Sequence, residues 1–454
     1  MRSENDQLRH DVRRLMLDLR QMKNFCEDPL VMSLGEGIYC YDIDGKRYIE
    51  GVSGIYVTNI GHGNRRVIDA IRAQQDRISF AGPLHSVSDS AVRYARRLGE
   101  IAPEGMTSIK LMSGGSEATE SAIKFARQYH LHTGSPTKYK VIGNYTGYHG
   151  GTYGAMSATG LGWPRKTPFA PFLSGFMQIP PPNCFRPPFG LDSETYSKTC
   201  GKILEYTIQQ EDPQTVSAFI VEPISNTGGI VVPPPNYLRE IRETCTKHNV
   251  LLIFDEIITG MGRTGNWFAS QTFGVTPDIL CCGKGMASGY TPLSAMIVRD
   301  DIYQRGFWDD EHRNPGFSHG HTFGANPVSA AAGLAVIEVI DQEKLLDLGR
   351  NVGEHIRARL TREVHDLGIL GEVRGAGALS CVEFVTRNGS KESFPTERRF
   401  GKRVEERMRA EGLLLRCDPN WIAFAPPLIM TLAQADEMLD IFARCVKDEL
   451  HTGK

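Results

Sequence analysis

The chain has 454 residues, of which 41% are hydrophobic and 23% are charged, and its formal net charge is −2. This length exceeds what one core usually supports, so we expect two domains. The near-neutral charge argues against nucleic-acid binding, and no run approaches the roughly 20 apolar residues that a membrane-spanning helix needs.

The N-terminal residues carry apolar side chains at helical spacing, with charged residues between them: Leu8, Val12, Leu15 and Leu19. This pattern predicts an amphipathic helix that docks on the protein. The segment lacks the apolar stretch and cleavage site of a signal peptide, so we expect a cytoplasmic protein. The ten cysteines are scattered without a C-x-x-C pair, which favours reduced and mostly buried thiols.

Residues 37–50 are expected to form a β-hairpin, because two β-rich runs flank Asp44 and Gly45. From about residue 65 the chain alternates between helices and short apolar strands, a pattern typical of a largely parallel sheet covered on both faces. We expect strands at 139–142, 216–221, 250–254, 278–282 and 294–298, with helices at 116–131 and 235–248.

The proline-rich residues 179–190 are expected to form a long loop. After a helix that begins near Pro327, the pattern is that of a small α+β domain with strands at 379–385, 413–416 and 421–425. The expected fold class is therefore α/β. We expect an N-terminal segment that joins the small domain, a large domain and a C-terminal small domain, at residues 1–65, 66–330 and 331–454.

Three local features are candidates for a functional site. Asp255 follows the expected strand 250–254, and open α/β sheets bind ligands at the carboxyl ends of their strands. Lys284 lies between two glycines after the strand 278–282, which leaves its amine accessible. The turn at 113–119 opens a helix, whose free N–H groups attract anions. Taken singly, each feature has a structural alternative: a capping acid, a surface lysine and an ordinary helix start.

Two other patterns are weaker. Residues 260–265 match G-x-G-x-x-G, with Asp278 beyond them, but residues 255–259 separate this run from the strand and no long helix follows. We therefore disfavour a nicotinamide site. His319 and His321 flank a glycine without a further ligand at metal-site spacing, so we expect no metal.

The motifs, in their order, resemble those of class III (subgroup II) pyridoxal-phosphate-dependent aminotransferases of fold type I, the ω-aminotransferase group. The similarity covers nearly the whole chain. It implies pyridoxal 5'-phosphate as cofactor and a large domain with a mostly parallel sheet beside a smaller α+β domain. The matching motifs are MSGGSEATE, NYTGYHGGT, VEPISNTGG, LLIFDEIITGMGRTG, CCGKGMASGYTPLSAM, HGHTFGANPVSAA and VRGAGALSCVEFV.

This resemblance also implies roles for single residues. Lys284 would carry the cofactor as an aldimine and transfer the proton, and Asp255 would face the pyridine nitrogen. Arg416 would be a mobile, carboxylate-binding arginine, with a surface arginine as the alternative, and Tyr56 would line the substrate pocket. The other implied cofactor contacts are Gly115 and Ser116 at the phosphate, Tyr148 and Ile257 on the ring faces, His149, Glu222, and Thr322 reaching the partner subunit's phosphate.

The implied reaction is ping-pong transfer of an amino group from an ω-amino acid or primary amine to a keto acid, with pyruvate giving alanine. It implies a homodimer, or a tetramer, with active sites at the subunit interface. An amino-acid racemase or epimerase of the same family, or a binding protein without activity, are the alternatives. Thr227 stands where ornithine, acetylornithine and 4-aminobutyrate enzymes often carry a glutamate, and residues 22–28 lack a frequent His-Pro pair. The donor amine therefore stays open.

Overall fold

A seven-stranded sheet forms the centre of the larger part of the molecule. The computed structural model describes residues 3–162, 164–308 and 316–452. Along the sheet the strands follow the order β4-β10-β9-β8-β7-β5-β6, and all neighbours run parallel except β10, which is antiparallel to both β9 and β4. The strands are β4 Ser108–Met112, β10 Ser294–Val298, β9 Ile279–Cys282, β8 Leu251–Glu256, β7 Val216–Val221, β5 Lys140–Asn144 and β6 Phe176–Ile179.

Both faces of this sheet are covered by helices, and the central strands β7 and β8 are buried at every position. In β8, Leu251 and Ile253 pack in a cluster with α6 (Gly115–His132). Leu252 and Phe254 point to the other face and pack with α9 and α10. The alternation places two layers of helix around one sheet and confirms the expected α/β fold class. The helices on the second face are α8 Ser193–Thr199, α9 Lys202–Gln210 and α10 Tyr237–Lys247.

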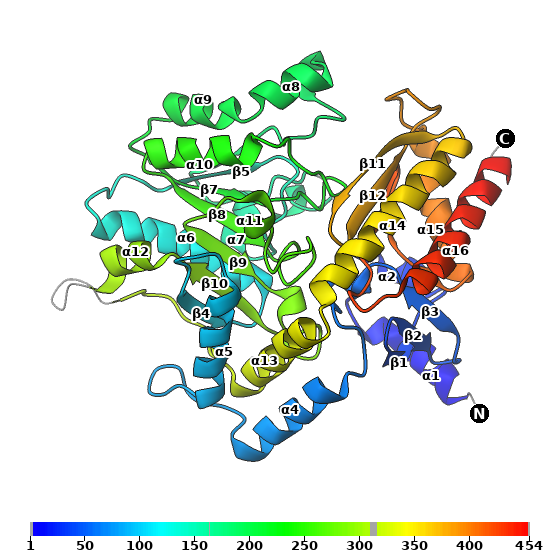
Figure 1. Cartoon of the computed structure of the whole chain (residues 1–454), viewed down its shortest axis with the longest axis horizontal. Coiled ribbons are helices and arrows are strands. Elements are labelled where there is room, and N and C mark those ends of the chain that lie inside the picture. The colour runs from blue at the N-terminus through cyan, green and yellow to red at the C-terminus, as the bar shows by residue number, and fades with distance from the viewer. Residues whose placement is uncertain (1–2, 163, 309–315, 453–454) are drawn as a thin grey trace.

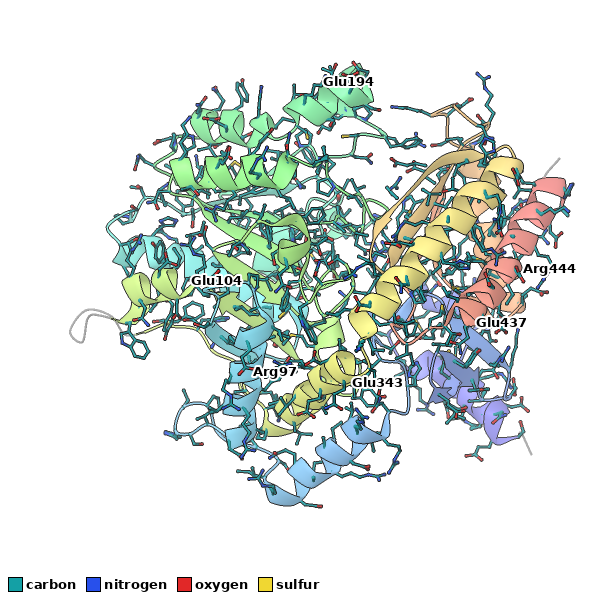
Figure 2. All side chains as sticks on the ribbon, in the orientation of Figure 1. Arg97, Glu104, Glu194, Glu343, Glu437 and Arg444 are labelled. Atoms are coloured by element: carbon teal, nitrogen blue, oxygen red, sulfur yellow. The ribbon has the colours of Figure 1, made fainter. Side chains whose placement is uncertain are left out.

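A smaller antiparallel sheet, of order β11-β12-β15-β14, lies on the other side of the molecule beside α14, α15 and α16 (Figure 1). Its inner face packs against these helices, whose outer faces are charged. In α16, for example, Met438 and Phe442 are buried, whereas Glu437 and Arg444 lie at the periphery (Figure 2). The elements are β11 Leu370–Ala376, β12 Leu379–Phe384, β14 Arg416–Asp418, β15 Trp421–Phe424, α14 Leu345–Asp366, α15 Phe400–Ala410 and α16 Leu432–Thr452.

The N-terminal strands join the C-terminal part of the chain. The expected hairpin is present as β2 (Tyr39–Asp42) and β3 (Arg47–Glu50), with a turn in which Gly45 has φ +81°. Together with β1 (Met32–Glu36), they form a sheet that β13 (Leu413–Leu414) completes by pairing parallel to β3. This pairing is consistent with an N-terminal segment that joins the small domain, while the domain limits given above stay a prediction.

The remaining helices connect these sheets or cover their edges. The expected helix near Pro327 is α13 (Pro327–Gln342), which packs against α4 and α5 and leads into α14. The Arg97 side chain on α5 donates to Asp341 of α13 at 2.7 Å (Figure 2). The other helices are α1 Glu4–Asp11, α2 Met22–Phe25, α3 Ser53–Tyr56, α4 Arg65–Arg77, α5 Asp89–Ile101, α7 Tyr153–Ala158, α11 Ala269–Phe273 and α12 Asp300–Tyr303.

Two expectations about local structure are wrong. The N-terminal helix ends at Asp11 and is followed by a short 3₁₀ turn to Arg14, so Leu15 and Leu19 are 56% and 69% exposed instead of docked. The expected strand 413–416 is divided between two sheets, because Leu414 pairs with β3 whereas Arg416 pairs with β15. The strands β1, β4, β6 and β11 were not expected.

Two further findings concern membrane-spanning segments and the cysteines. Among the described residues, no helix combines the length and the apolar character needed to cross a membrane. All ten cysteines are free thiols, and most of them are buried.

Candidate active site

The predicted cofactor residues follow neighbouring strands of the large sheet. Asp255 belongs to the end of β8, Lys284 follows β9, Glu222 follows β7 and His149 lies beyond β5. These four strands run parallel, so their carboxyl ends meet at one edge of the sheet, where open α/β folds bind ligands.

A buried carboxylate and a buried imidazole form the centre of this edge. Asp255 Oδ2 lies 2.7 Å from His149 Nδ1, and both side chains are almost completely buried. Asp255 Oδ1 accepts a hydrogen bond from the Ile257 backbone N–H at 3.1 Å. Because a carboxylate can only accept, Nδ1 of His149 carries a proton here. These bonds hold an acidic side chain in one orientation where the strand ends.

Lys284 is the amine of the site. Its backbone has a φ of +43°, which is unusual for a residue with a side chain and typical of strain held at functional positions. Burial lowers the pKa of Lys284, an effect that the negative charges of Asp255 and Glu222 oppose and the positive charge of Arg416 reinforces. The lowered pKa favours the neutral amine, which is the nucleophilic form.

The turn before α6 presents free backbone N–H groups. The first N–H groups of a helix have no acceptor within it. Here Glu117 Oε2 accepts those of Ser113 and Gly114 at 3.0 and 3.1 Å, which leaves Gly115 and Ser116 available to an anion. The hydroxyl of Ser116 accepts the Gly151 N–H at 2.9 Å. An 18-residue helix adds the positive end of its dipole at this point.

Ile257 brings the anion-binding turn and the lysine loop together. A Cβ atom added to Gly115 or to Gly283 would lie 3.1 Å from Ile257 side-chain carbons, so both glycines allow close packing on this isoleucine. Tyr148 is 39% exposed, and its backbone N–H donates to Glu222 Oε1 at 3.0 Å. An apolar side chain and an exposed aromatic ring are therefore both available at the site.

Glu222 is a second acid at this edge. It also accepts the Asn226 N–H at 3.0 Å. Burial raises the pKa of Glu222 to about 7, and the nearby negative charge of Asp255 acts in the same direction, while His149 opposes it. This carboxyl group can therefore change its protonation state near neutral pH.

The two predicted substrate residues come from outside the large sheet. Tyr56 is only 1% exposed and packs with Ile224 and Ala423, so its ring belongs to an apolar cluster. Burial raises the pKa of Tyr56 to about 12, although the nearby Arg416 guanidinium lowers it in part. Arg416 begins β14, and its positive charge lowers the pKa of both Tyr56 and Lys284. The structure thus brings Arg416 near the amine, whereas Tyr56 presents little surface to a substrate.

Thr322 lies apart from these residues. It is exposed and lines a cavity of about 1010 Å³ together with Phe80, Leu84 and Lys110. Lys284 and Asp255 do not line this cavity. Thr322 thus lines a different cavity from Lys284 and Asp255, although Nδ1 of the neighbouring His321 lies 3.7 Å from Glu117 Oε1 at the start of α6.

Several supporting residues were not predicted. The Thr119 hydroxyl donates to the His149 carbonyl, which fixes α6 to the histidine loop. Ser294 Oγ donates to the Gly114 carbonyl at 2.8 Å, and Thr159 Oγ1 accepts the His149 N–H at 2.9 Å. Thr119 belongs to the motif MSGGSEATE and Ser294 to the motif CCGKGMASGYTPLSAM, whereas Thr159 lies outside the matching motifs.

The G-x-G-x-x-G run does not form a nucleotide turn. Residues 260–265 form turns that lead only to the short helix α11, and Arg263 is fully buried, donating to the carbonyl groups of Ala425 and Pro426. Asp278 pairs with Arg242 and Arg299. In the parts of the chain that the structure describes, no three His, Cys, Asp or Glu side chains are grouped as a metal site would require.

Comparisons with known proteins identify the family. The family model for class-III aminotransferases matches residues 23–446. The chain is 36% identical to an adenosylmethionine-8-amino-7-oxononanoate aminotransferase from Geobacter sulfurreducens, over 95% of each chain. It is 30% identical to a putrescine–pyruvate aminotransferase from Pseudomonas aeruginosa, over 92% of this chain and 90% of that protein.

Solved structures agree with this assignment. An (S)-enantioselective ω-transaminase from Thermomicrobium roseum superposes with a TM-score of 0.92 at 35% identity, over 99% of each chain. The ω-transaminase from Pseudomonas jessenii in complex with PMP gives a TM-score of 0.93 at 31% identity, over 99% of each chain. The chain therefore belongs to the class-III aminotransferases, which depend on pyridoxal phosphate.

The residues present suit that cofactor. A buried carboxylate suits a protonated pyridine nitrogen, the free N–H groups of Gly115 and Ser116 suit a phosphate, and an amine with a lowered pKa suits an aldehyde. The buried Nε2 atom of His149 has no hydrogen-bond partner in the described residues, which leaves polar capacity next to Asp255. Chemistry and arrangement are thus consistent with a pyridoxal-phosphate site.

Proposed function

We propose that this class-III aminotransferase transfers the amino group of a primary amine or ω-amino acid to pyruvate, giving alanine, by a ping-pong mechanism. The observation that carries the proposal is the Arg416 guanidinium, whose positive charge lowers the pKa of Lys284 and whose ion-pair partner among the described residues is Asp418, at 3.8 Å. Such a cation can bind a keto-acid carboxylate and can also leave room for an uncharged substrate. The putrescine–pyruvate relative and the ω-transaminase neighbours support this substrate class.

Thr227 gives further support. Its hydroxyl donates to the Thr146 carbonyl, and its side chain offers Arg416 no negative charge. A carboxylate at this position would compete with a substrate for the guanidinium. Thr227 stands where such enzymes often carry a glutamate, and this difference argues against ornithine, acetylornithine and 4-aminobutyrate as the main donors.

In this proposal Lys284 binds the cofactor and later moves the proton at the reacting carbon. When bound, pyridoxal phosphate supplies a carbonyl that takes up the amino group and a ring that withdraws electrons from that carbon. Lys284 accepts the proton in its neutral form and returns it in its charged form, for which a lowered pKa is suited. Asp255, held in one orientation by His149, would face the pyridine nitrogen of the cofactor.

The other contacts follow from the same arrangement. Gly115 and Ser116 would bind the phosphate, and Ile257 and Tyr148 would enclose the ring. Glu222, with a pKa of about 7, would lie on the phenolic side. Tyr56, which is buried next to Arg416, would act on the substrate pocket by positioning that arginine.

We further propose a homodimer, or a pair of such dimers, with each active site completed by Thr322 of the partner subunit. Thr322 is exposed on the wall of a cavity, and Phe80, Leu84 and Phe323 around it are large, exposed apolar side chains. Such a surface is typical of an interface. The cytoplasmic location expected from the sequence stays a prediction.

The test is a panel of amines with pyruvate and the purified, cofactor-loaded enzyme, followed by quantification of alanine. Alanine that forms in proportion to the carbonyl product of at least one amine supports the proposal. Racemisation of an amino acid without a keto acid would contradict it and favour the racemase alternative. A monomer with full activity at all concentrations would contradict the shared site.

A further inference from the structure

The small sheet presents two different faces. Val382, Phe384, Ile422 and Phe424 point toward α14, α15 and α16 and are fully buried there. Their sequence neighbours point the other way, so that Cys381, Ala423 and Ala425 pack with Tyr56. The second face is therefore turned toward the candidate substrate pocket.

Strand register places charged residues on this second face in two rows. The first row crosses the sheet as Arg374, Cys381, Ala423 and Arg416. The adjacent row crosses it as Glu372, Glu383, Trp421 and Asp418. The first row therefore has an arginine at each end. The second row places acids and a tryptophan beside these two arginines.

The two arginines have very different surroundings. Arg374 donates to Glu372 and Glu383 at 2.8 and 2.6 Å and to the Gly229 carbonyl at 2.7 Å, and its side chain is only 8% exposed. Two charge-assisted bonds and a buried position fix it in place.

Arg416 is held much more weakly, although the buried Tyr56 hydroxyl lies close enough for the guanidinium to lower its pKa in part. Its Nε atom lies 3.8 Å from Asp418 Oδ2, beyond hydrogen-bond distance, and its guanidinium carbon lies 5.2 Å from the centre of the Trp421 ring. Its side chain is 25% exposed. A contact with a ring face is only weakly directional, so the guanidinium can turn without losing it completely.

We propose that Asp418 and Trp421 form a resting cradle for Arg416 and thereby set the balance between substrates with and without a carboxylate. This inference rests on the proposed role of Arg416 in binding a keto-acid carboxylate. A substrate carboxylate competes with Asp418 for the guanidinium. A substrate that lacks a carboxylate leaves Arg416 paired with Asp418 and stacked on Trp421. Both are positioning residues, because they act through Arg416.

Surrounding charges support this role for Asp418. Burial raises the pKa of Asp418, whereas the positive charges of Arg416, Arg165 and Lys402 lower it. Lys402 also pairs with Glu405, and the Nε atom of Arg416 lies 3.8 Å from Asp418 Oδ2. The carboxyl group is therefore placed to attract Arg416 without saturating it.

The experiment uses the full-length, cofactor-loaded enzyme and single half-reactions followed by the visible absorbance of the cofactor. L-Alanine is the probe with a carboxylate, and butylamine is the probe without one. Asp418→Asn should lower the apparent Kd for alanine and raise that for butylamine, each about two- to fivefold, the range expected for a partly exposed ion pair. Trp421→Leu should shift the ratio of the two constants in the same direction, and Trp421→Phe, which keeps a ring, should restore it to within about twofold.

Two controls separate the cradle from other effects. Asp448→Asn removes an equal charge from the exposed face of α16 and should leave the ratio unchanged. In an Arg416→Leu background, Asp418→Asn should have no effect on the ratio, because the residue through which it acts is absent.

The inference is overturned if Asp418→Asn changes both constants by the same factor, alters only the limiting rate or shifts the ratio equally without Arg416. If Asp418→Asn does not bind cofactor, the two Trp421 variants decide the matter on the same criterion. A wild-type enzyme that reacts with neither alanine nor any amine in the panel contradicts the proposed function instead.

Discussion

At Gly150, one added methyl group should weaken cofactor binding and leave the folding of the apoenzyme nearly unchanged. Its φ is +132°, a backbone region that is essentially restricted to glycine. A Cβ atom there would lie 2.6 Å from Ser116 Oγ and 2.8 Å from Ser116 Cα, at the turn that we propose to bind phosphate. Gly150→Ala therefore requires both a different backbone conformation and a displaced Ser116.

The expected size follows from these contacts. Adapting the backbone costs about 1–3 kcal/mol, and losing the hydrogen bond from Gly151 N–H to Ser116 Oγ costs about 0.5–1.5 kcal/mol. The apoenzyme can relieve this strain by moving the loop away from the turn, but a bound phosphate needs the turn in place. We thus expect the binding of pyridoxal phosphate to weaken by about 2–4 kcal/mol, which corresponds to a Kd about 30- to 1000-fold higher.

Gly151 provides a matched control one residue away. No atom lies within 4 Å of a Cβ added to Gly151, and its φ is not positive. Equilibrium titration of apoenzyme with pyridoxal phosphate should give a weakened Kd for Gly150→Ala and a nearly unchanged one for Gly151→Ala, with similar thermal unfolding midpoints of the two apoenzymes. A Kd for Gly150→Ala within about threefold of wild type would refute the steric reasoning.

Three further predictions concern the polar residues of the site. Lys284→Ala should abolish the visible absorbance of the lysine-bound cofactor and reduce alanine formation to background, and survival of the band in a spectrum of the purified protein would identify another lysine. Asp255→Asn, which replaces a charge-assisted bond by a neutral one, should cost about 1.5–3 kcal/mol and lower kcat with a good donor about 10- to 150-fold, as measured in the pyruvate assay. Glu222 has its pKa raised from 4.5 to about 7, so the folded chain retains a proton that the unfolded chain loses between these values. Its contribution to the stability of the apoenzyme is complete below pH 4.5 and is lost as the pH rises through 7. Glu222→Gln should therefore flatten the pH dependence of the free energy of unfolding, measured with urea at pH 5–8. An unchanged pH dependence would contradict the raised pKa of Glu222.

Much of the large domain could be predicted because its strands are short and fully buried. The ranges 216–221 and 294–298 coincide with β7 and β10, since six or five consecutive apolar or small residues between turns have few alternatives to a buried strand. β4 was missed because Lys110 interrupts its pattern, and β11 because Gly371 and Gly375 weaken it. These strands form through pairing with β10 and β12, a tertiary effect that no local window contains.

The prediction of a longer N-terminal helix was wrong for a different reason. The helical spacing from Leu8 to Leu19 is real, but such spacing stabilises a helix only if a surface receives its apolar side. In the chain described here only Val12 of that set is buried, and the backbone becomes extended at Leu15. Periodicity therefore predicted the start of the element, and the absence of a packing surface determined its end.

The candidate site illustrates a related limit. Lys284, Asp255 and the turn at Gly115 follow elements that were expected, so their meeting at one sheet edge could be foreseen. The environment of Arg416 could not, because it depends on the register between β14 and β15, which lie within ten residues of each other but pair only in one way.

That register distinguishes the arginine that we propose to bind a substrate carboxylate from the arginine that is fixed in the fold. Arg374 and Arg416 occupy opposite ends of the same cross-strand row, and each has an acid two positions along its own strand. What distinguishes them is the next strand: Glu383 beside Arg374 supplies a second carboxylate, whereas Trp421 beside Asp418 supplies a ring. An enzyme that must bind a carboxylate in one half-reaction and release it in the other needs a cation whose charge is only partly satisfied. In our proposal the same sheet thus holds Arg374 for stability and Arg416 for binding and release of a carboxylate, and one cross-strand neighbour, Glu383 or Trp421, makes the difference.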